Sequence, residues 1–208
     1  MLEIRGEATG LLDEPLALRA RGGVVERWQA RLLDDDRRSW RAQASRAEAL
    51  MDAWAPAKPG AGPVAALASL RPVRIDVRAE TAEGAAASRT FERRLLGDGV
   101  QVRRWRAPAP TATLFLPHGP AGGVVVLDAG ATLAGALLAS RGVVALVVAG
   151  DEREPALELL ARVPAAAEQA PLVEAGVGAP PGVPAVAPAD GAAWDALLAR
   201  AGATPRPA

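Results

Sequence analysis

The side chains that could act as a nucleophile or as a base are few in this chain. It has one histidine, His118, five serines and no cysteine. A serine activated by a histidine is a common nucleophile for acyl transfer, and Ser140 with His118 is one such combination. Simpler interpretations are a polar helix end for Ser140 and a surface turn for His118, and we favour these. The absence of cysteine excludes disulfides, thiolate metal sites and a cysteine nucleophile.

The stretch from Gly122 to Asp151 contains elements that could position such chemistry. Residues 124–127 and 143–149 are short, β-branched apolar runs bounded by glycines, which is typical of strands buried on both faces. Residues 132–140 lie between them and have apolar side chains at helical spacing. Strand, helix and strand in this order predict a βαβ unit, whose parallel strands need helices on both faces.

The turns after these two strands form the predicted ligand-binding edge. Ligands of open α/β sheets bind at the carboxyl ends of the strands, here residues 128–131 and 150–151. A nucleotide-binding alternative uses Gly130 after the first strand and Asp151, 21 residues further on, as a ribose-binding acid. The turn runs from Gly130 to Gly135 without matching G-x-G-x-x-G or a P-loop, so we do not adopt this alternative.

The composition excludes several classes of partner. The 24 basic and 24 acidic residues balance to a formal net charge of zero, so no global field favours nucleic acid or an anionic membrane. No apolar stretch approaches the roughly 20 residues that span a bilayer, and the first residues have no signal-peptide pattern. We therefore expect a cytoplasmic protein with no nucleic-acid partner, no membrane partner and no cofactor.

Residues 1–106 have the pattern of β structure. Apolar and polar residues alternate over residues 27–32 and 40–45, on either side of an acidic turn at residues 34–36, which predicts a hairpin. Residues 73–78 alternate most clearly. The acidic turn lacks the ligand spacing of a calcium loop. Several short strands separated by turn residues are typical of a β-sandwich.

A small basic cluster lies near the end of this region. Arg103, Arg104 and Arg106 surround Trp105. Arginines beside an aromatic residue can bind nucleic acid, but solvated arginines on an edge strand explain the cluster more simply.

Residues 107–208 have the pattern of an incomplete α/β domain. After the βαβ unit, residues 155–167 predict a helix and residues 172–175 a third parallel strand. Residues 183–187 predict a weak strand, and residues 192–201 a last helix.

The order of these segments resembles the acyl-CoA thioester hydrolase and bile acid-CoA:amino acid N-acyltransferase family. The likeness extends over about residues 3–165. The strongest match is Leu-Leu-Ala-Ser-Arg-Gly at residues 137–142. The other matching segments are the opening strand at residues 11–20, the strand pair around Trp28 and Trp40, the loop at Trp54, residues 70–73, and residues 99–117.

The resemblance implies a mixed fold in two parts. Residues 1–106 would form an all-β, immunoglobulin-like sandwich. Residues 107–208 would form a truncated α/β-hydrolase-like domain, a parallel β-sheet with flanking helices. It also implies thioester chemistry, in which a serine or cysteine on a nucleophile elbow attacks an acyl-CoA carbonyl with the help of a histidine and an aspartate.

The resemblance assigns four positions in this chain. If Gly176 matches the first glycine of the elbow, the nucleophile position is Gly178, which has no side chain. Asp190 is the candidate acid, although a helix N-cap explains it with fewer assumptions. The backbone N–H groups of Gly130 and Ala131 lie where the oxyanion loop is expected.

The family's catalytic histidine lies near the C-terminus, whereas His118 precedes the βαβ unit. We therefore predict a degenerate or truncated family member, a pseudoenzyme with little or no thioesterase or acyltransferase activity. Its ligand would be acyl-CoA or CoA. The alternative is a non-catalytic module that binds a protein partner or another copy of itself.

Overall fold

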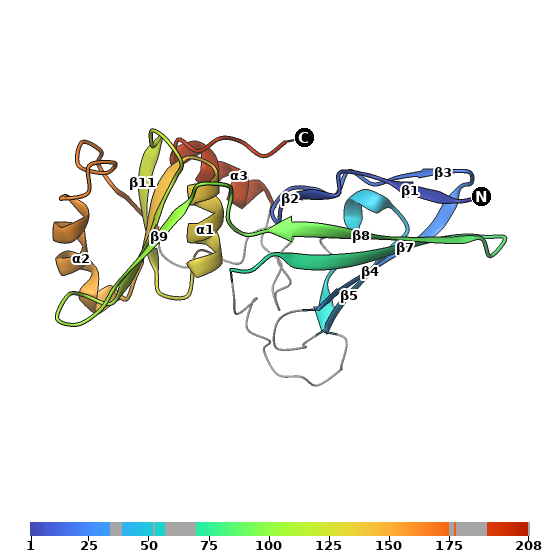
Figure 1. Ribbon diagram of the computed structural model, residues 1–208, viewed down its shortest axis with the longest axis horizontal. Helices are drawn as coiled ribbons and strands as arrows, with labels where there is room; N and C mark the ends of the chain where they lie inside the picture. The colour runs from blue at the N-terminus through green and yellow to red at the C-terminus, as the bar shows by residue number, and fades with distance from the viewer. Residues whose placement is uncertain (34–38, 52, 57–69, 175–176, 178–190, 208) are drawn as a thin grey trace. The chain divides into compact units, whose positions relative to one another are not determined.

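The computed structural model describes residues 1–33, 39–51, 53–56, 70–174, 177 and 191–207. Within them the chain has a mixed, sheet-rich fold with three sheets and three α-helices (Figure 1). It divides into two compact units. The first is built mainly from Met1–Arg94, and the second from Leu95–Pro180 with Ala189–Arg206.

This division lies after Arg94, whereas the sequence pattern placed the boundary at residue 106. The difference is strand β9 (Gln101–Trp105), which pairs antiparallel with β10 (Ala112–Leu116) in the second unit. Trp105 also packs against the apolar core of that unit. The alternating sequence of β9 resembles that of the preceding strands. Only its pairing with β10 therefore shows that it belongs to the second unit.

The first unit contains a six-stranded sheet in the order β2-β8-β7-β4-β5-β6. Strand β2 joins β8 in parallel, and all the other neighbours are antiparallel. The strands are β2 (Thr9–Leu11), β4 (Val25–Leu33), β5 (Ser39–Ala44), β6 (Ala55–Pro56), β7 (Val73–Thr81) and β8 (Ala86–Arg94). Strands β1 (Glu3–Arg5) and β3 (Arg19–Arg21) form a separate antiparallel pair. The two paired strands of the predicted hairpin are confirmed as β4 and β5, and the clearly alternating strand is confirmed as β7. The acidic turn predicted at residues 34–36 lies outside the described residues.

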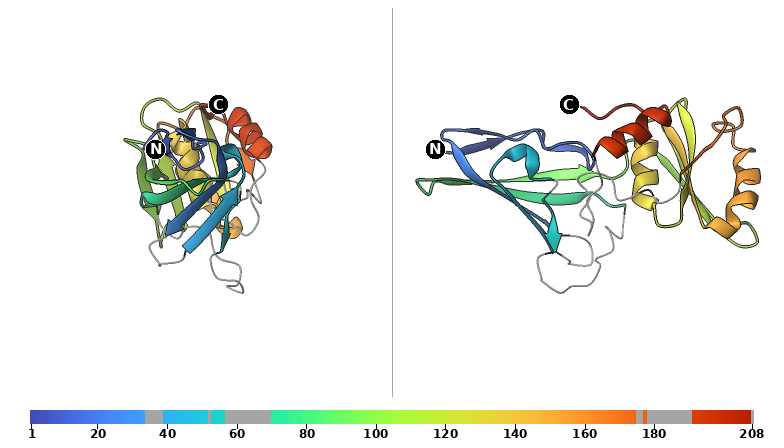
Figure 2. Two further views of the ribbon diagram at one scale, coloured as in Figure 1. Left: turned by 90° about the vertical axis from the view of Figure 1, so that its right-hand side faces the viewer. Right: turned by 180° about the vertical axis from the view of Figure 1, so that it is seen from behind.

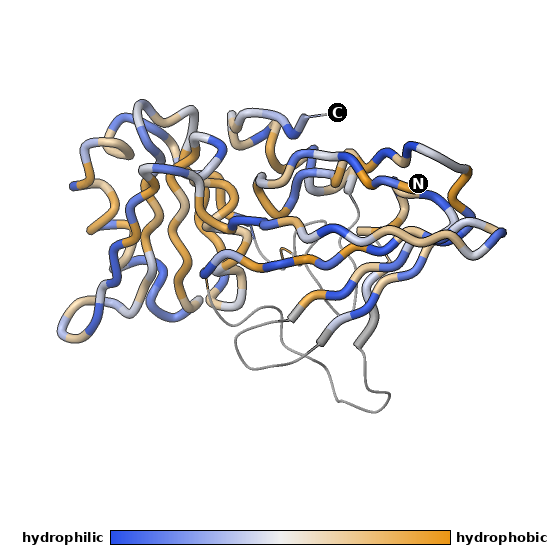
Figure 3. The backbone as a smooth tube through the Cα atoms, turned by 45° about the vertical axis from the view of Figure 1, so that its right-hand side comes forward, coloured by the Kyte–Doolittle hydropathy of each residue, from blue (hydrophilic) through white to orange (hydrophobic). Residues whose placement is uncertain are grey.

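The two faces of the six-stranded sheet differ in polarity because residues alternate along each strand. On β7, Val73, Ile75 and Val77 are buried, whereas the residues between them are exposed. The same face carries the buried side chains of Trp28 and Phe91. Figure 3 shows the alternation of apolar and polar positions along these strands. The outward face is therefore polar.

The second unit contains a five-stranded sheet in the order β13-β11-β12-β10-β9. Strand β11 (Gly123–Asp128) pairs in parallel with both β12 (Val143–Val148) and β13 (Leu172–Glu174). The predicted βαβ unit and third parallel strand are confirmed. The sheet is mixed, not wholly parallel as expected, because β10 pairs antiparallel with β12 and β9 pairs antiparallel with β10.

Three helices belong to this unit. Helix α1 (Thr132–Ser140) has the predicted bounds, and α3 (Gly191–Arg200) matches the predicted last helix. Helix α2 (Arg153–Leu160) ends seven residues before the predicted end, and turns follow it. Pro164 has no backbone N–H for a helical hydrogen bond, which is consistent with this early end. The weak strand predicted at residues 183–187 lies outside the described residues.

Helices α1 and α2 cover opposite faces of the sheet (Figure 2). Ala156 and Leu160 of α2 join a buried cluster that includes Val124 and Val144. On the other face α1 approaches the sheet at Gly135, where a Cβ atom would lie 2.9 Å from Val147 Cγ2. The result is a sheet between two helical layers.

Candidate functional site

The strand order of the second unit creates one edge suited to ligand binding. From β11 the chain passes through α1 to β12 on one side, and then through α2 to β13 on the other side. This reversal is a topological switch point, where open α/β sheets bind ligands outside the carboxyl ends of the strands. The carboxyl edge carries Asp128 at the end of β11 and Glu174 at the end of β13.

The turn between β11 and α1 contains the two predicted oxyanion donors. The N–H of Ala131 already donates a hydrogen bond to the carbonyl of Asp128, at 2.9 Å. Gly130 is exposed, and a Cβ atom on it would meet nothing within 4 Å. The turn therefore leaves Gly130 as the accessible amide of the pair, and an oxyanion hole needs at least two converging donors.

An ion pair that the sequence did not indicate joins β11 to α2 at this edge. Arg153, the first residue of α2, lies 2.8 Å from the Asp128 carboxylate, and both side chains are partly exposed. The Nε atom of Arg153 is buried without a hydrogen-bond partner among the described groups. Arg153 and Asp128 are 25 positions apart in the sequence. No local sequence pattern could therefore predict their ion pair.

The neighbouring charges at this edge are also engaged. Glu152 accepts a hydrogen bond from the Thr111 N–H at 2.9 Å. Glu174 forms an ion pair with Arg200 at 2.8 Å. Asp151, which the nucleotide alternative required, is exposed in the 3₁₀ turn that follows β12. Two ion pairs, Asp128 with Arg153 and Glu174 with Arg200, therefore link strands of this edge to helices α2 and α3.

His118 and Ser140 lie at the opposite edge of the sheet. Strand β10 runs antiparallel to β12, so its end near Leu116 lies beside the beginning of β12. His118 follows that end, is exposed, and rests against Gly99, where a Cβ atom would lie 2.6 Å from His118 Nδ1. Helix α1 begins at the carboxyl edge and also brings Ser140 to the opposite one.

The Ser140 hydroxyl forms hydrogen bonds with two backbone groups. Its Oγ donates to the carbonyl of Ala136 at 2.8 Å and accepts from the Gly97 N–H at 2.7 Å. Within the described part of the chain, no hydrogen bond joins Ser140 to His118. The structure thus brings both residues to one edge of the sheet, without forming a nucleophile and base pair there. Gly178 and Asp190, the other two predicted site positions, lie outside the described residues.

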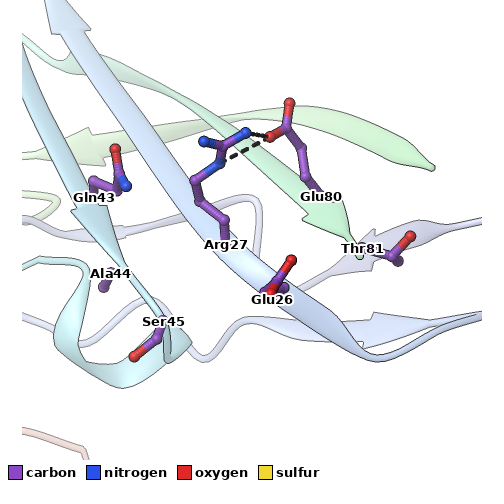
Figure 4. A pocket seen from close by; sticks show the side chains of 7 residues that line it. All are labelled: Glu26, Arg27, Gln43, Ala44, Ser45, Glu80 and Thr81. Carbon is purple, nitrogen blue, oxygen red and sulfur yellow. Dashed lines mark hydrogen bonds and ion pairs between the residues drawn. The ribbon is translucent and has the colours of Figure 1, made fainter. Parts of the chain in front are cut away.

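A second candidate site, which sequence reasoning missed, is a polar hollow in the first unit (Figure 4). Its volume is about 460 Å³. A β-bulge at Glu26 shifts the register of β4 against β7, and bulges bend the strand and redirect side chains. A bulge is defined by the partner strand, so the alternation of β4 could not indicate it. The hollow is lined by Glu26, Arg27, Gln43, Ala44, Ser45, Glu80 and Thr81.

Glu80 is the charge centre of this hollow. Arg27 donates from Nε at 2.9 Å and through a second guanidinium nitrogen to the same carboxylate oxygen, and Arg78 donates to the other oxygen. These hydrogen bonds, from Arg27 above all, lower the pKa of Glu80. Two arginines share one carboxylate, so this group of three side chains keeps a positive charge.

The sites contain no evident metal centre. Among the described residues, no three or more His, Cys, Asp or Glu side chains gather closely enough to hold a metal ion. No helix in that part of the chain is long and apolar enough to cross a membrane. No protein-family model and no curated protein matches this chain.

The basic cluster at β9 lies on an edge strand, as predicted. Strand β9 has β10 as its one neighbour in the sheet. Arg103 and Arg104 are exposed on it, while Trp105 is partly buried. Charged side chains on an edge strand discourage pairing with other chains.

Proposed function

We propose that this protein is a non-catalytic relative of the acyl-CoA thioester hydrolase and N-acyltransferase family, which binds CoA or an acyl-CoA without turning it over. One observation carries the proposal. The residues able to act as nucleophile and base, Ser140 and His118, lie at the edge of the sheet opposite the switch point. The Ser140 hydroxyl, in addition, is already bonded on both sides.

The sequence of the segment after β13 supports the same conclusion. A nucleophile elbow would follow this strand, at the turn into the next helix. Residues 175–190 contain no serine, threonine, cysteine or histidine. Gly178, the position that the resemblance assigns to the nucleophile, cannot attack a carbonyl. Asp190 would then orient no histidine, and capping a helix is the simpler role for it.

The arrangement of the second unit supports a binding role at the carboxyl edge. β11 is the third strand of this unit, and the loop after the third strand of an α/β-hydrolase supplies one of the oxyanion donors. Gly130 in this loop could still donate to a thioester carbonyl. We also propose that the first unit is immunoglobulin-like and that the second is hydrolase-like. The proposed location is the cytoplasm.

Turnover is tested by measuring release of CoA thiol from medium- and long-chain acyl-CoAs by the purified protein. We expect no release above the buffer rate. His118→Ala and Ser140→Ala serve as matched variants, because a contaminating esterase would be unaffected by either. Hydrolysis that scales with protein concentration and disappears in His118→Ala would contradict the proposal.

Binding is tested by calorimetry with CoA, with NAD and with ATP. The proposal predicts heat with CoA that is altered by Gly130→Pro, which removes the accessible N–H. Heat with NAD that is lost in Asp151→Asn would favour the nucleotide alternative. Silence with all three ligands would contradict CoA binding and favour a module that binds a protein partner.

A further inference from the structure

The outward face of the six-stranded sheet contains an unusual pair of like charges. The register of β4 with β5 places Arg31 directly opposite Arg41. Both side chains are exposed on the polar face. Directly opposed residues of an antiparallel pair have Cβ atoms about 5 Å apart, and like charges at this separation are destabilising. The register therefore places two arginine side chains next to each other on the exposed face of the sheet.

The described acid that lies opposite this pair is Asp76, the β7 partner of Arg31. Its Oδ1 accepts a hydrogen bond from the Thr90 hydroxyl at 2.7 Å, which leaves the carboxylate charged. On the other side Arg41 is opposite Ala55. Within the described residues, no ion pair shorter than 4 Å engages Arg31 or Arg41. Arg27 on the same strand differs, because it forms an ion pair with Glu80.

Two amides continue the polar surface beside the arginines. Gln29 lies directly opposite Gln43, one step along the same face. Residues two apart on a strand are about 7 Å apart. The Cβ positions of two arginines and two glutamines thus lie at the corners of a rectangle of about 5 by 7 Å. Gln43 also lines the polar hollow, so the rectangle continues into that concavity.

We propose that Arg31 and Arg41, flanked by Gln29 and Gln43, form a binding site for a phosphate group on a polar carrier. Two adjacent guanidinium groups can bind a tetrahedral dianion through paired charge-assisted hydrogen bonds. A bound phosphate offsets the repulsion between the two arginines, which lowers the stability of the unliganded protein. The amides supply neutral donors and acceptors for the oxygen atoms of the carrier.

This site is independent of the proposed function, because it lies in the first unit and uses none of the residues at the switch point. The outward positions of β4, β5, β7 and β8 whose side chains are described carry no aromatic residue on which a base could stack. Recognition of single-stranded nucleic acid depends on such stacking. The chemistry therefore favours a phosphate group itself over a nucleic-acid strand.

The test compares thermal unfolding and calorimetric binding with sodium pyrophosphate as the probe. Arg41→Gln and Arg31→Gln each remove one charge of the pair. Arg74→Gln is the matched control, because Arg74 is an exposed arginine on the same face, opposite Glu92. Without the probe, we expect Arg41→Gln to unfold at the same temperature as the unchanged protein or higher.

With pyrophosphate, the unchanged protein and Arg74→Gln should bind equally and shift to a higher unfolding temperature. Arg41→Gln and Arg31→Gln should bind about tenfold more weakly or worse, because each loses a charge-assisted pair of hydrogen bonds. A lower unfolding temperature of probe-free Arg41→Gln would overturn the proposal. Equal weakening in Arg74→Gln would also overturn it.

The source of the phosphate is distinguished by a second arm. Vesicles of phosphatidylcholine with and without phosphatidic acid are sedimented with the protein. Pyrophosphate binding without sedimentation assigns the site to a soluble phosphate. Sedimentation that requires both phosphatidic acid and Arg41 assigns the same chemistry to a lipid headgroup. No response to either probe overturns the proposal.

Discussion

At the scale of single residues, the chain shows how a chemically capable side chain can serve structure alone. Ser140 ends α1 and bonds to the backbone of its own helix and of Gly97. The sequence predicted a polar helix end, and the structure confirms it. The link to Gly97 could not be predicted, because it joins residues 43 positions apart through the fold.

Ser140→Ala should therefore reduce stability. The Gly97 N–H would lose its acceptor, and a hydrogen bond of this kind contributes about 1 kcal/mol. Chemical denaturation followed by tryptophan fluorescence measures the difference. Ser88→Ala is the control, because Ser88 is exposed on β8. An equal effect of both substitutions would contradict the structural role of Ser140.

Asp195 on α3 provides a pH-dependent test. Arg206 donates from Nε to Oδ1 at 2.7 Å and from a terminal nitrogen to Oδ2 at 2.8 Å. This bidentate hydrogen bonding lowers the pKa of Asp195 below its ordinary value of 3.8. A lowered pKa in the folded state means that the pair stabilises the protein above that ordinary value and loses this effect as the pH falls through the folded pKa.

Asp195→Asn should cost about 0.5 kcal/mol at pH 7, because the Asp195 side chain is 53% exposed, although that of Arg206 is only 19% exposed. The cost should shrink as the pH is lowered below about 4. Urea unfolding at several pH values, with Arg206→Gln to complete a double-mutant cycle, measures it. A difference between the two proteins that does not change with pH would contradict the ion pair.

At the scale of elements, local patterns predicted the bounds of helices and strands better than their partners. The periodicity of residues 132–140 is contained within one element, and α1 has these bounds. The placement of β9 depends on pairing with β10, and the hollow depends on the Glu26 bulge against β7. Neither is encoded in a single stretch of sequence, so neither was predicted.

The contact of α1 with the sheet is tested at Gly135. A Cβ atom there would lie 2.9 Å from Val147 Cγ2 and 3.1 Å from the Phe115 ring, and both side chains are buried. Glycine to alanine gains up to about 1 kcal/mol in helix propensity, but overpacking of a rigid core costs about 1–3 kcal/mol. Gly135→Ala should therefore destabilise the protein by about 1 kcal/mol.

Gly130→Ala is the control for this comparison, because a Cβ atom on Gly130 meets open space. We expect it to unfold within about 0.5 kcal/mol of the unchanged protein, as surface substitutions do. Denaturant titration measures the free energy of unfolding of the unchanged protein and of the two variants. A stabilising effect of Gly135→Ala would show that α1 lies further from the sheet than the structure indicates.

At the scale of the whole molecule, the chain divides into two compact units, each with buried apolar residues. Ile75 is fully buried in the first and Leu146 in the second. Removing either side chain to Cβ should cost about 2–5 kcal/mol within its own unit. Ile75→Ala should speed hydrogen exchange in β4, β7 and β8 while leaving β11 and β12 protected, and Leu146→Ala should do the reverse. Loss of protection in both units from either substitution would contradict the division into two units.

We propose that no side chain of this protein accepts an acyl group from CoA. Intact-mass spectrometry after incubation with excess long-chain acyl-CoA tests it most directly, because a nucleophile would retain the acyl group during the reaction. We predict a single species at the mass of the unmodified chain. An added acyl mass on a serine, absent from Ser140→Ala or from His118→Ala, would contradict the claim.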